Sequence, residues 1–328
     1  MRALRRRRAT IELPVPTARP SFGFAFRAMS SACELRLEGD DEAALAAAAQ
    51  RAIDEVLRIE HKYSRYREDS IVSRINAAAG GADAVTVDAE TAALLAFAGE
   101  LHDASEGLFD ITSGVLRRAW DFRAGRLPEP AALAALLPLI GWDKVEFGDA
   151  RVRLPEAGME LDFGGFGKEY AADRAATLLA EAGVRHGFVN LGGDIRVIGA
   201  RADGAPWRFG IAHPRVADAT IASVEMSGGA LATSGDYERY FEHEGKRYCH
   251  ILDPRTGWPV SAWASISVAA PACLAAGALS TIAMLEGARA LDFLGTRQAT
   301  FLAVDPALHT FDHGLVQPTS NLPAGDSE

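Results

Sequence analysis

The stretch GFVNLGGDIRVIG, residues 187–199, shows most plainly what kind of fold this chain adopts. Two short runs rich in Phe, Val, Leu and Ile flank Gly192-Gly193, a pair that suits a two-residue turn between antiparallel strands. Further short strand patterns follow it: WRFGIA, ASVEM, GGALAT, KRYCHIL and SISVAA. Because these strands form one block between helical segments, the sequence predicts an α+β fold with mainly antiparallel sheets flanked by helices.

Four segments outside this block have the apolar spacing of helices. We expect helices from a cap at residues 40–41 to about residue 63, and over about 88–104, 168–182 and 273–285. No linker-like stretch divides the middle of the chain, so we expect one domain over residues 23–316. A disordered arm over residues 1–22 and a disordered tail over residues 317–328 would flank that domain.

Composition excludes some classes of function. The chain has 328 residues, 48% of them hydrophobic and 24% charged, which is typical of a globular protein. Its net charge of −10 argues against a general nucleic-acid binder, which needs a basic face. The basic run Arg5–Arg8 precedes a stretch with a glutamate and three prolines, not the apolar core of an export signal. We therefore expect a cytoplasmic protein without membrane insertion.

The three cysteines, Cys33, Cys249 and Cys273, show no CxxC spacing. An odd number with this spacing indicates neither a disulfide framework nor a zinc site. Cys249 precedes His250, so a thiol nucleophile has to be considered. In a strand these neighbouring side chains point to opposite faces, which argues against a catalytic pair.

The stretch LDFGGFGKEYAADRAATLL, residues 161–179, has the outline of an anion site. Its glycines allow close backbone approach, and the following helix would present free N–H groups beside Lys168. The spacing matches neither the phosphate-binding loop nor the dinucleotide fingerprint. A phosphate site is one interpretation, and a flexible loop with a solvated lysine is the other.

Other polar segments are weaker signals when each is taken alone. His250, in YCHILDPRTGWPV, is either a general base or a structural histidine of a strand. Asp194 would lie at the edge of the glycine hairpin, and backbone groups of residues 233–235 could bind a planar ring. SRYREDSIVSRIN and GLFDITSGVL read as polar loops.

Together and in this order, these motifs resemble those of the FAD:protein FMN transferases, the ApbE family, from about Ala28 to Gly287. The resemblance implies an ApbE-like α+β domain that binds FAD as a substrate and uses a divalent metal, usually Mg²⁺. It implies cleavage of the FAD pyrophosphate and transfer of FMN to a Thr or Ser hydroxyl of an acceptor flavoprotein, as a phosphoester.

The same resemblance implies roles for individual residues. His250 would be the base for the acceptor hydroxyl, and Lys168 would bind the pyrophosphate as a second catalytic residue. The metal would be bound by the carbonyl group of Gly167 and by Thr281. The implied FAD-binding residues are Met29, Lys168, Asp173, Gly193, Asp194, Thr233, Ser234, Gly235 and His250.

The chain departs from the family pattern where a metal-binding aspartate is usual, because Gly277 stands there. Metal affinity should fall unless Asp253 or another acid replaces that carboxylate. Restoring the acid by Gly277→Asp is expected to tighten metal binding. Lesser departures are Glu169, where glycine usually follows the lysine, and Ser30, where glycine is frequent. A non-catalytic FAD-binding protein and an FAD pyrophosphatase are the alternative functions.

Overall fold

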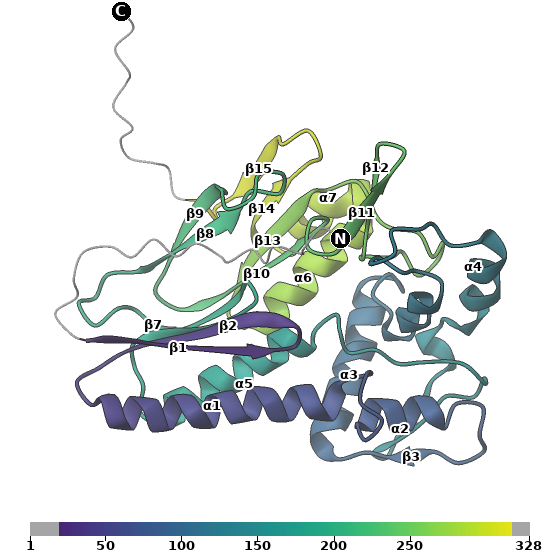
Figure 1. Ribbon diagram of the computed structural model, residues 1–328, viewed down its shortest axis with the longest axis horizontal. Helices are drawn as coiled ribbons and strands as arrows, with labels where there is room; N and C mark the ends of the chain where they lie inside the picture. The colour runs from purple at the N-terminus through teal and green to yellow at the C-terminus, as the bar shows by residue number, and fades with distance from the viewer. Residues whose placement is uncertain (1–19, 317–328) are drawn as a thin grey trace, which may run out of the picture.

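An eight-stranded antiparallel sheet forms the centre of the molecule (Figure 1). The computed structural model describes residues 20–316, so most of the predicted arm and all of the predicted tail lie outside the described residues. In spatial order the strands are β1 (Ser21–Ala28), β2 (Ser31–Glu38), β6 (Gly187–Leu191), β7 (Asp194–Gly199), β10 (Gly229–Gly235), β13 (Ser265–Ala270), β14 (Thr300–Val304) and β15 (Thr310–His313). Every neighbouring pair is antiparallel, and the predicted α+β class is confirmed.

The four predicted helices all form, with ends within two residues of the expected ones. They are α1 (Glu42–Tyr63), α3 (Ala89–Ala104), α5 (Gly167–Glu181) and α6 (Cys273–Glu286). The Asp41 side chain accepts a hydrogen bond from the N–H of Ala44 at 2.9 Å and begins α1. Gly183, with φ +91°, follows α5 in the left-handed conformation that glycine tolerates.

Both faces of the sheet are covered over its central strands, which are mostly buried, whereas the edge strands β1 and β15 are largely exposed. On one face α5 packs against β6, β7 and α1, and α6 packs against β10 and β13. On the other face lies the hairpin of β8 (Trp207–Ala212) and β9 (Thr220–Met226), with its own apolar core. Adjacent residues of β6 divide between the two cores: Val189 joins the helical side and Phe188 joins the hairpin side.

The sequence reading missed β1, and this corrects the predicted arm. β1 begins at Ser21, so the arm predicted over residues 1–22 runs two residues too far. The turn between β1 and β2 contains no glycine, so the sequence gives no turn signal there. Met29 and Ser30 form it with left-handed φ values of +50° and +61°. A tertiary contact supports this turn: the carboxylate of Glu60 accepts a hydrogen bond from the Met29 N–H at 2.7 Å.

Smaller elements complete the described chain. They are α2 (Ile71–Ala77), β3 (Val85–Thr86), η1 (Ile111–Arg118), α4 (Pro130–Leu136), η2 (Leu137–Leu139), η3 (Trp142–Lys144), β4 (Glu146–Gly148), β5 (Arg151–Arg153), β11 (Tyr240–His243), β12 (Lys246–Cys249), η4 (Gly287–Arg289) and α7 (Ala290–Thr296). The stretch Cys273–Thr296 is long and apolar enough to cross a membrane by composition. Half of its most apolar window is buried within the protein, where α6 packs on β10 and β13, so it reads as a core helix.

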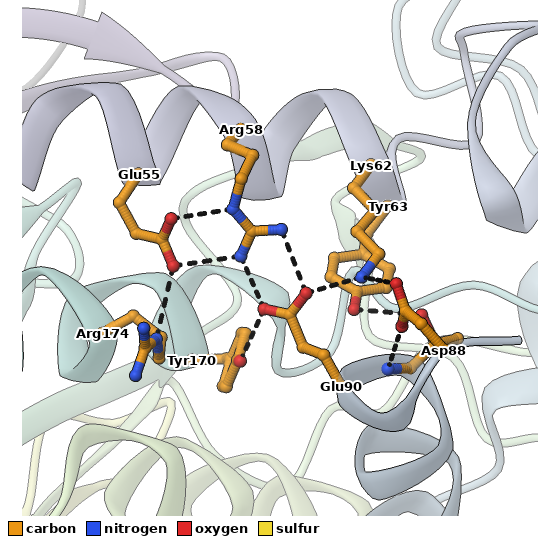
Figure 2. Close-up of polar contacts among 9 residues, drawn as sticks. Glu55, Arg58, Lys62, Tyr63, Asp88, Glu90, Tyr170 and Arg174 are labelled. Atoms are coloured by element: carbon orange, nitrogen blue, oxygen red, sulfur yellow. Dashed lines mark hydrogen bonds and ion pairs between the residues drawn. The ribbon is translucent and has the colours of Figure 1, made fainter.

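A polar cluster ties α1, α3 and α5 together at one side of the fold (Figure 2). Glu90 of α3 accepts hydrogen bonds from Arg58 and Lys62 of α1, both at 2.6 Å, and from the Tyr170 hydroxyl of α5 at 2.7 Å. Burial raises the pKa of Glu90, but these bonds more than offset it and lower that pKa to about 2. The cluster therefore holds the N-terminal part of α5 against α1 and α3.

Candidate functional site

The first turn of α5 places a partly buried ion pair beside the β6–β7 hairpin. Lys168 Nζ lies 2.5 Å from Asp194 Oδ2, and Asp194 is the first residue of β7. Burial alone would lower the pKa of Lys168, but the charges of Asp194 and Glu169 raise it. Lys168 therefore stays charged at the helix N-terminus, where N–H groups and the helix dipole already favour an anion.

The predicted glycine hairpin is present and leaves open space beside this lysine. Leu191 pairs with Asp194, so Gly192 and Gly193 form the turn, with φ values of +64° and +102°. A Cβ on Gly192 would lie 2.7 Å from Ser31, whereas one on Gly193 would meet no atom within 4 Å. Gly192 is thus required by close packing and by its φ, while a Cβ on Gly193 would meet open space, although its φ also favours glycine.

Two motifs predicted as polar loops are partly helical, since they contain α2 and η1, and they hold the segment before α5. Arg65 forms an ion pair with Asp162. Asn76 exchanges two hydrogen bonds with the backbone of Leu161, at 2.7 and 3.0 Å. From the other motif, the carbonyl of Ile111 accepts from the Asp162 N–H at 2.9 Å. These contacts fix the path of the chain into the first turn of α5 and so position Lys168.

Asp173, which the resemblance places among the FAD-binding residues, has a structural role in the fold. Its two carboxylate oxygens accept hydrogen bonds from the backbone N–H groups of Cys273 and Leu274, both at 2.9 Å. Arg196 lies 3.0 Å from the same carboxylate. Asp173 therefore caps the N-terminus of α6 and fixes α6 against α5.

Hydroxyl groups from β10 and α6 meet on the inner side of the site. Ser234 Oγ lies 2.8 Å from Ser280 Oγ and 3.0 Å from Thr281 Oγ1, and Thr233 Oγ1 lies 2.7 Å from Ser267 Oγ. The structure thus brings Ser234 to the predicted metal ligand Thr281. Next to them, a Cβ on Gly235 would lie 2.5 Å from the Tyr237 ring, so a larger residue would displace that ring.

His250 is half-buried, and its Nδ1 has no hydrogen-bond partner. Burial, with Arg239 and Lys168 acting in the same direction, lowers the pKa of His250 to about 4. The imidazole is therefore neutral at pH 7 and able to accept a proton. Its neighbour Cys249 is buried, and burial raises the pKa of that thiol to about 11, so the protonated thiol is unsuited to nucleophilic attack.

Glu169 is the residue whose importance the sequence reading underestimated. It is 8% exposed, and its Oε2 has no hydrogen-bond partner. Burial, with Asp194 adding to it, raises the pKa of Glu169 well above the usual range. A Cβ on Gly277 would lie 2.5 Å from Cγ and 2.7 Å from Oε1 of Glu169. The sequence signal for this contact was a pair of departures from the family pattern: an acid at position 169, where glycine is usual, and a glycine at position 277, where aspartate is usual.

Asp253, the acid named in the sequence reading as a replacement, has other partners. Arg255 donates to its carboxylate from the side chain, at 3.0 and 2.7 Å, and from the backbone, at 2.9 Å.

Among residues 20–316 no three His, Cys, Asp or Glu side chains form a metal-binding group. A cation at this site would need backbone and hydroxyl oxygens as well. A cavity of about 610 Å³ near Arg58 and His61 is lined by none of the candidate site residues.

Comparisons with known proteins agree with this geometry. The ApbE family profile matches residues 29–303. A Haemophilus influenzae FAD:protein FMN transferase is 30% identical over 86% of this chain and 85% of that protein. A Klebsiella pneumoniae protein of the same name is 35% identical over 71% and 72%. The crystal structure of the ApbE protein from Thermotoga maritima has a TM-score of 0.83 and 30% identity, covering 90% of this chain and 97% of that one. The flavin transferase ApbE from Vibrio cholerae has a TM-score of 0.80 and 25% identity, covering 90% and 98%.

Proposed function

The chain belongs to the ApbE family, and on that premise we propose that it is an FAD:protein FMN transferase. It would move FMN from FAD to a Thr or Ser hydroxyl of an acceptor flavoprotein. The observation that carries the proposal is a charged Lys168 at the start of α5 together with a neutral His250, whose buried Nδ1 has no hydrogen-bond partner.

The residues of the chain divide the work of this reaction. Lys168 and the N–H groups of the first turn of α5 bind the negatively charged pyrophosphate of FAD. The neutral imidazole of His250 accepts the proton of the acceptor hydroxyl. The acceptor oxygen forms a bond to the FMN phosphorus while the bond between that phosphorus and the bridging pyrophosphate oxygen breaks. AMP leaves with the bridging oxygen, so atoms and charge balance.

Mg²⁺ dependence belongs to the same proposal. The site offers the oxygen donors that Mg²⁺ prefers, namely the Gly167 carbonyl and the Thr281 hydroxyl, next to a buried carboxylate oxygen without a hydrogen bond. These two residues would hold the ion, which when bound offsets the negative charge of the pyrophosphate. Met29, Thr233 and Gly235 remain proposed FAD-binding residues.

Intact-mass spectrometry of an acceptor domain tests the transfer. The domain is incubated with this protein, FAD and Mg²⁺, and a family member that modifies the same domain is the positive control. We expect the mass of the domain to rise by one FMN, and we expect His250→Asn to slow the transfer by about 100-fold or more. His309→Asn, at an exposed histidine, should leave the rate unchanged. FAD binding without added mass would contradict the proposal and favour a binding protein.

FMN and AMP formed without an acceptor would favour a pyrophosphatase.

Cytoplasmic residence is also part of the proposal. Fractionation of cells that express the chain tests it, and we expect the protein in the cytoplasmic fraction.

A further inference from the structure

We propose that Glu169 provides the carboxylate that binds the divalent cation in this protein, in place of a side chain at position 277. The inference rests on the proposed function, since it identifies a ligand for the Mg²⁺ of that reaction. Two observations support it: the close approach of Glu169 to Gly277, and a buried carboxylate oxygen without a hydrogen-bond partner.

The first observation is that the Glu169 side chain fills the space beside Gly277. An added Cβ there would lie 2.5, 2.7 and 2.9 Å from Cγ, Oε1 and Cδ of Glu169, closer than real Cβ atoms come. Residues 277 and 281 are four apart on α6, so they share one face of the helix. The Glu169 carboxylate therefore lies on the face that carries Thr281, one helical turn away.

The second observation is that Glu169 is buried with an unsatisfied oxygen. Lys168, its neighbour in the chain, forms a 2.5 Å ion pair with Asp194, and Oε2 of Glu169 accepts no hydrogen bond. A buried carboxylate without a partner is costly, and native proteins satisfy such groups with a proton, a counter-ion or a metal. When ionised, the two buried carboxylates outnumber the one lysine, so the site has a net negative charge that a cation would offset.

The remaining ligands lie on the two helices that Glu169 bridges. The Gly167 carbonyl is two residues before Glu169 on α5, and α5 packs against α6, which carries Thr281. Ser234 is already 3.0 Å from the Thr281 hydroxyl. One carboxylate with carbonyl and hydroxyl oxygens is a donor set suited to Mg²⁺ or Mn²⁺, with water completing the shell.

This arrangement overturns the expectation that Gly277→Asp alone would tighten metal binding. The new side chain would collide with Glu169 and place a third carboxylate in the same buried space. Moving the acid should instead succeed only as a pair of changes. Glu169→Gly combined with Gly277→Asp removes the obstruction and returns one carboxylate to the same face of α6.

Binding of Mn²⁺, followed by the electron paramagnetic resonance signal of the free ion, tests the inference without measuring transfer. The full chain is titrated in the presence of saturating FAD, and FAD alone is the blank. We expect one Mn²⁺ per chain, and a Glu169→Gln affinity at least about tenfold weaker, as for loss of a ligand or its support. Glu181→Gln, an exposed acid of the same helix, should bind like the wild type.

The paired substitution sharpens the test. Gly277→Asp and Glu169→Gly should each weaken Mn²⁺ binding, and the double variant should bind more tightly than either. Wild-type affinity in Glu169→Gln would overturn the inference and indicate a protonated glutamic acid sharing its proton with Asp194. Absence of Mn²⁺ binding by the wild type would also overturn it. If the wild type transfers FMN but Glu169→Gln binds Mn²⁺ as tightly as the wild type, the inference fails and the proposed function stands. If Glu169→Gln loses Mn²⁺ binding but the wild type transfers no FMN, the proposed function fails and the metal site stands.

Discussion

Replacing Asp173 with alanine should destabilise the fold rather than act on a ligand directly. The substitution removes two hydrogen bonds, at 2.9 Å each, between a carboxylate and the first N–H groups of α6, and it leaves Arg196 without its 3.0 Å partner. Hydrogen bonds to charged groups contribute roughly 1.5–3 kcal/mol each, and the partly exposed site reduces the sum to about 3 kcal/mol. At an unfolding entropy of about 2.1 cal/mol/K per residue, that is a fall in Tm of about 4 °C for 328 residues.

Thermal unfolding followed by circular dichroism, without FAD, measures this change. Asp173→Asn should be similarly destabilised, because its amide replaces one acceptor with a donor that faces a backbone N–H. Asp83→Asn, at an exposed aspartate, is the control and should change Tm by less than about 1 °C. A wild-type Tm in Asp173→Ala, together with weakened FAD binding, would refute the capping argument and assign the carboxylate to the ligand.

Three further predictions concern acid stability and the hairpin. Glu90 has a folded pKa of about 2, below its unfolded value, so its stabilisation is present above about pH 4.5 and is lost as the pH falls toward 2. Because Glu90 is partly exposed, urea unfolding at pH 7 and pH 3 should differ by about 1 kcal/mol more in the wild type than in Glu90→Gln. His250 has a folded pKa of about 4, so protonation favours the unfolded chain and stability falls from about pH 6.5 downward; proton NMR should show one imidazole titrating near pH 4, absent from His250→Asn. Gly192→Ala should cost about 2 kcal/mol or more, because it adds left-handed strain to a 2.7 Å contact with Ser31, and adding Ser31→Gly should recover part of that loss.

Each of these predictions has a result that would contradict it. Equal pH dependence in the wild type and Glu90→Gln would mean that its ion pairs are screened by solvent. An imidazole titrating near pH 6.5 and lost in His250→Asn would place this ring in water. If Ser31→Gly brings no recovery, backbone strain alone accounts for the cost at Gly192.

Local sequence was sufficient for the elements whose patterns are self-contained. The strand block from Phe188 onward alternates or runs apolar between glycine turns, and the four long helices carry apolar stripes. The side-chain caps of α1 and α3, Asp41 and Asp88, also depend only on near neighbours. β1 was not predicted, because its turn at Met29-Ser30 depends on Glu60, a residue far along the chain. Such a contact has no signal in the local pattern.

The same division runs through the candidate site. The order of motifs along the chain determined by itself that this is an ApbE-type α+β protein, with Lys168 at a helix start and a tight turn before Asp194. The tertiary structure alone decided that Asp173 caps another helix and that His250 is neutral. It also decided that Glu169 and Gly277, two separate departures in the sequence, occupy one place. Burial and packing between distant segments set these properties. The residues concerned become neighbours only in the folded chain, so the sequence carries no local signal for them.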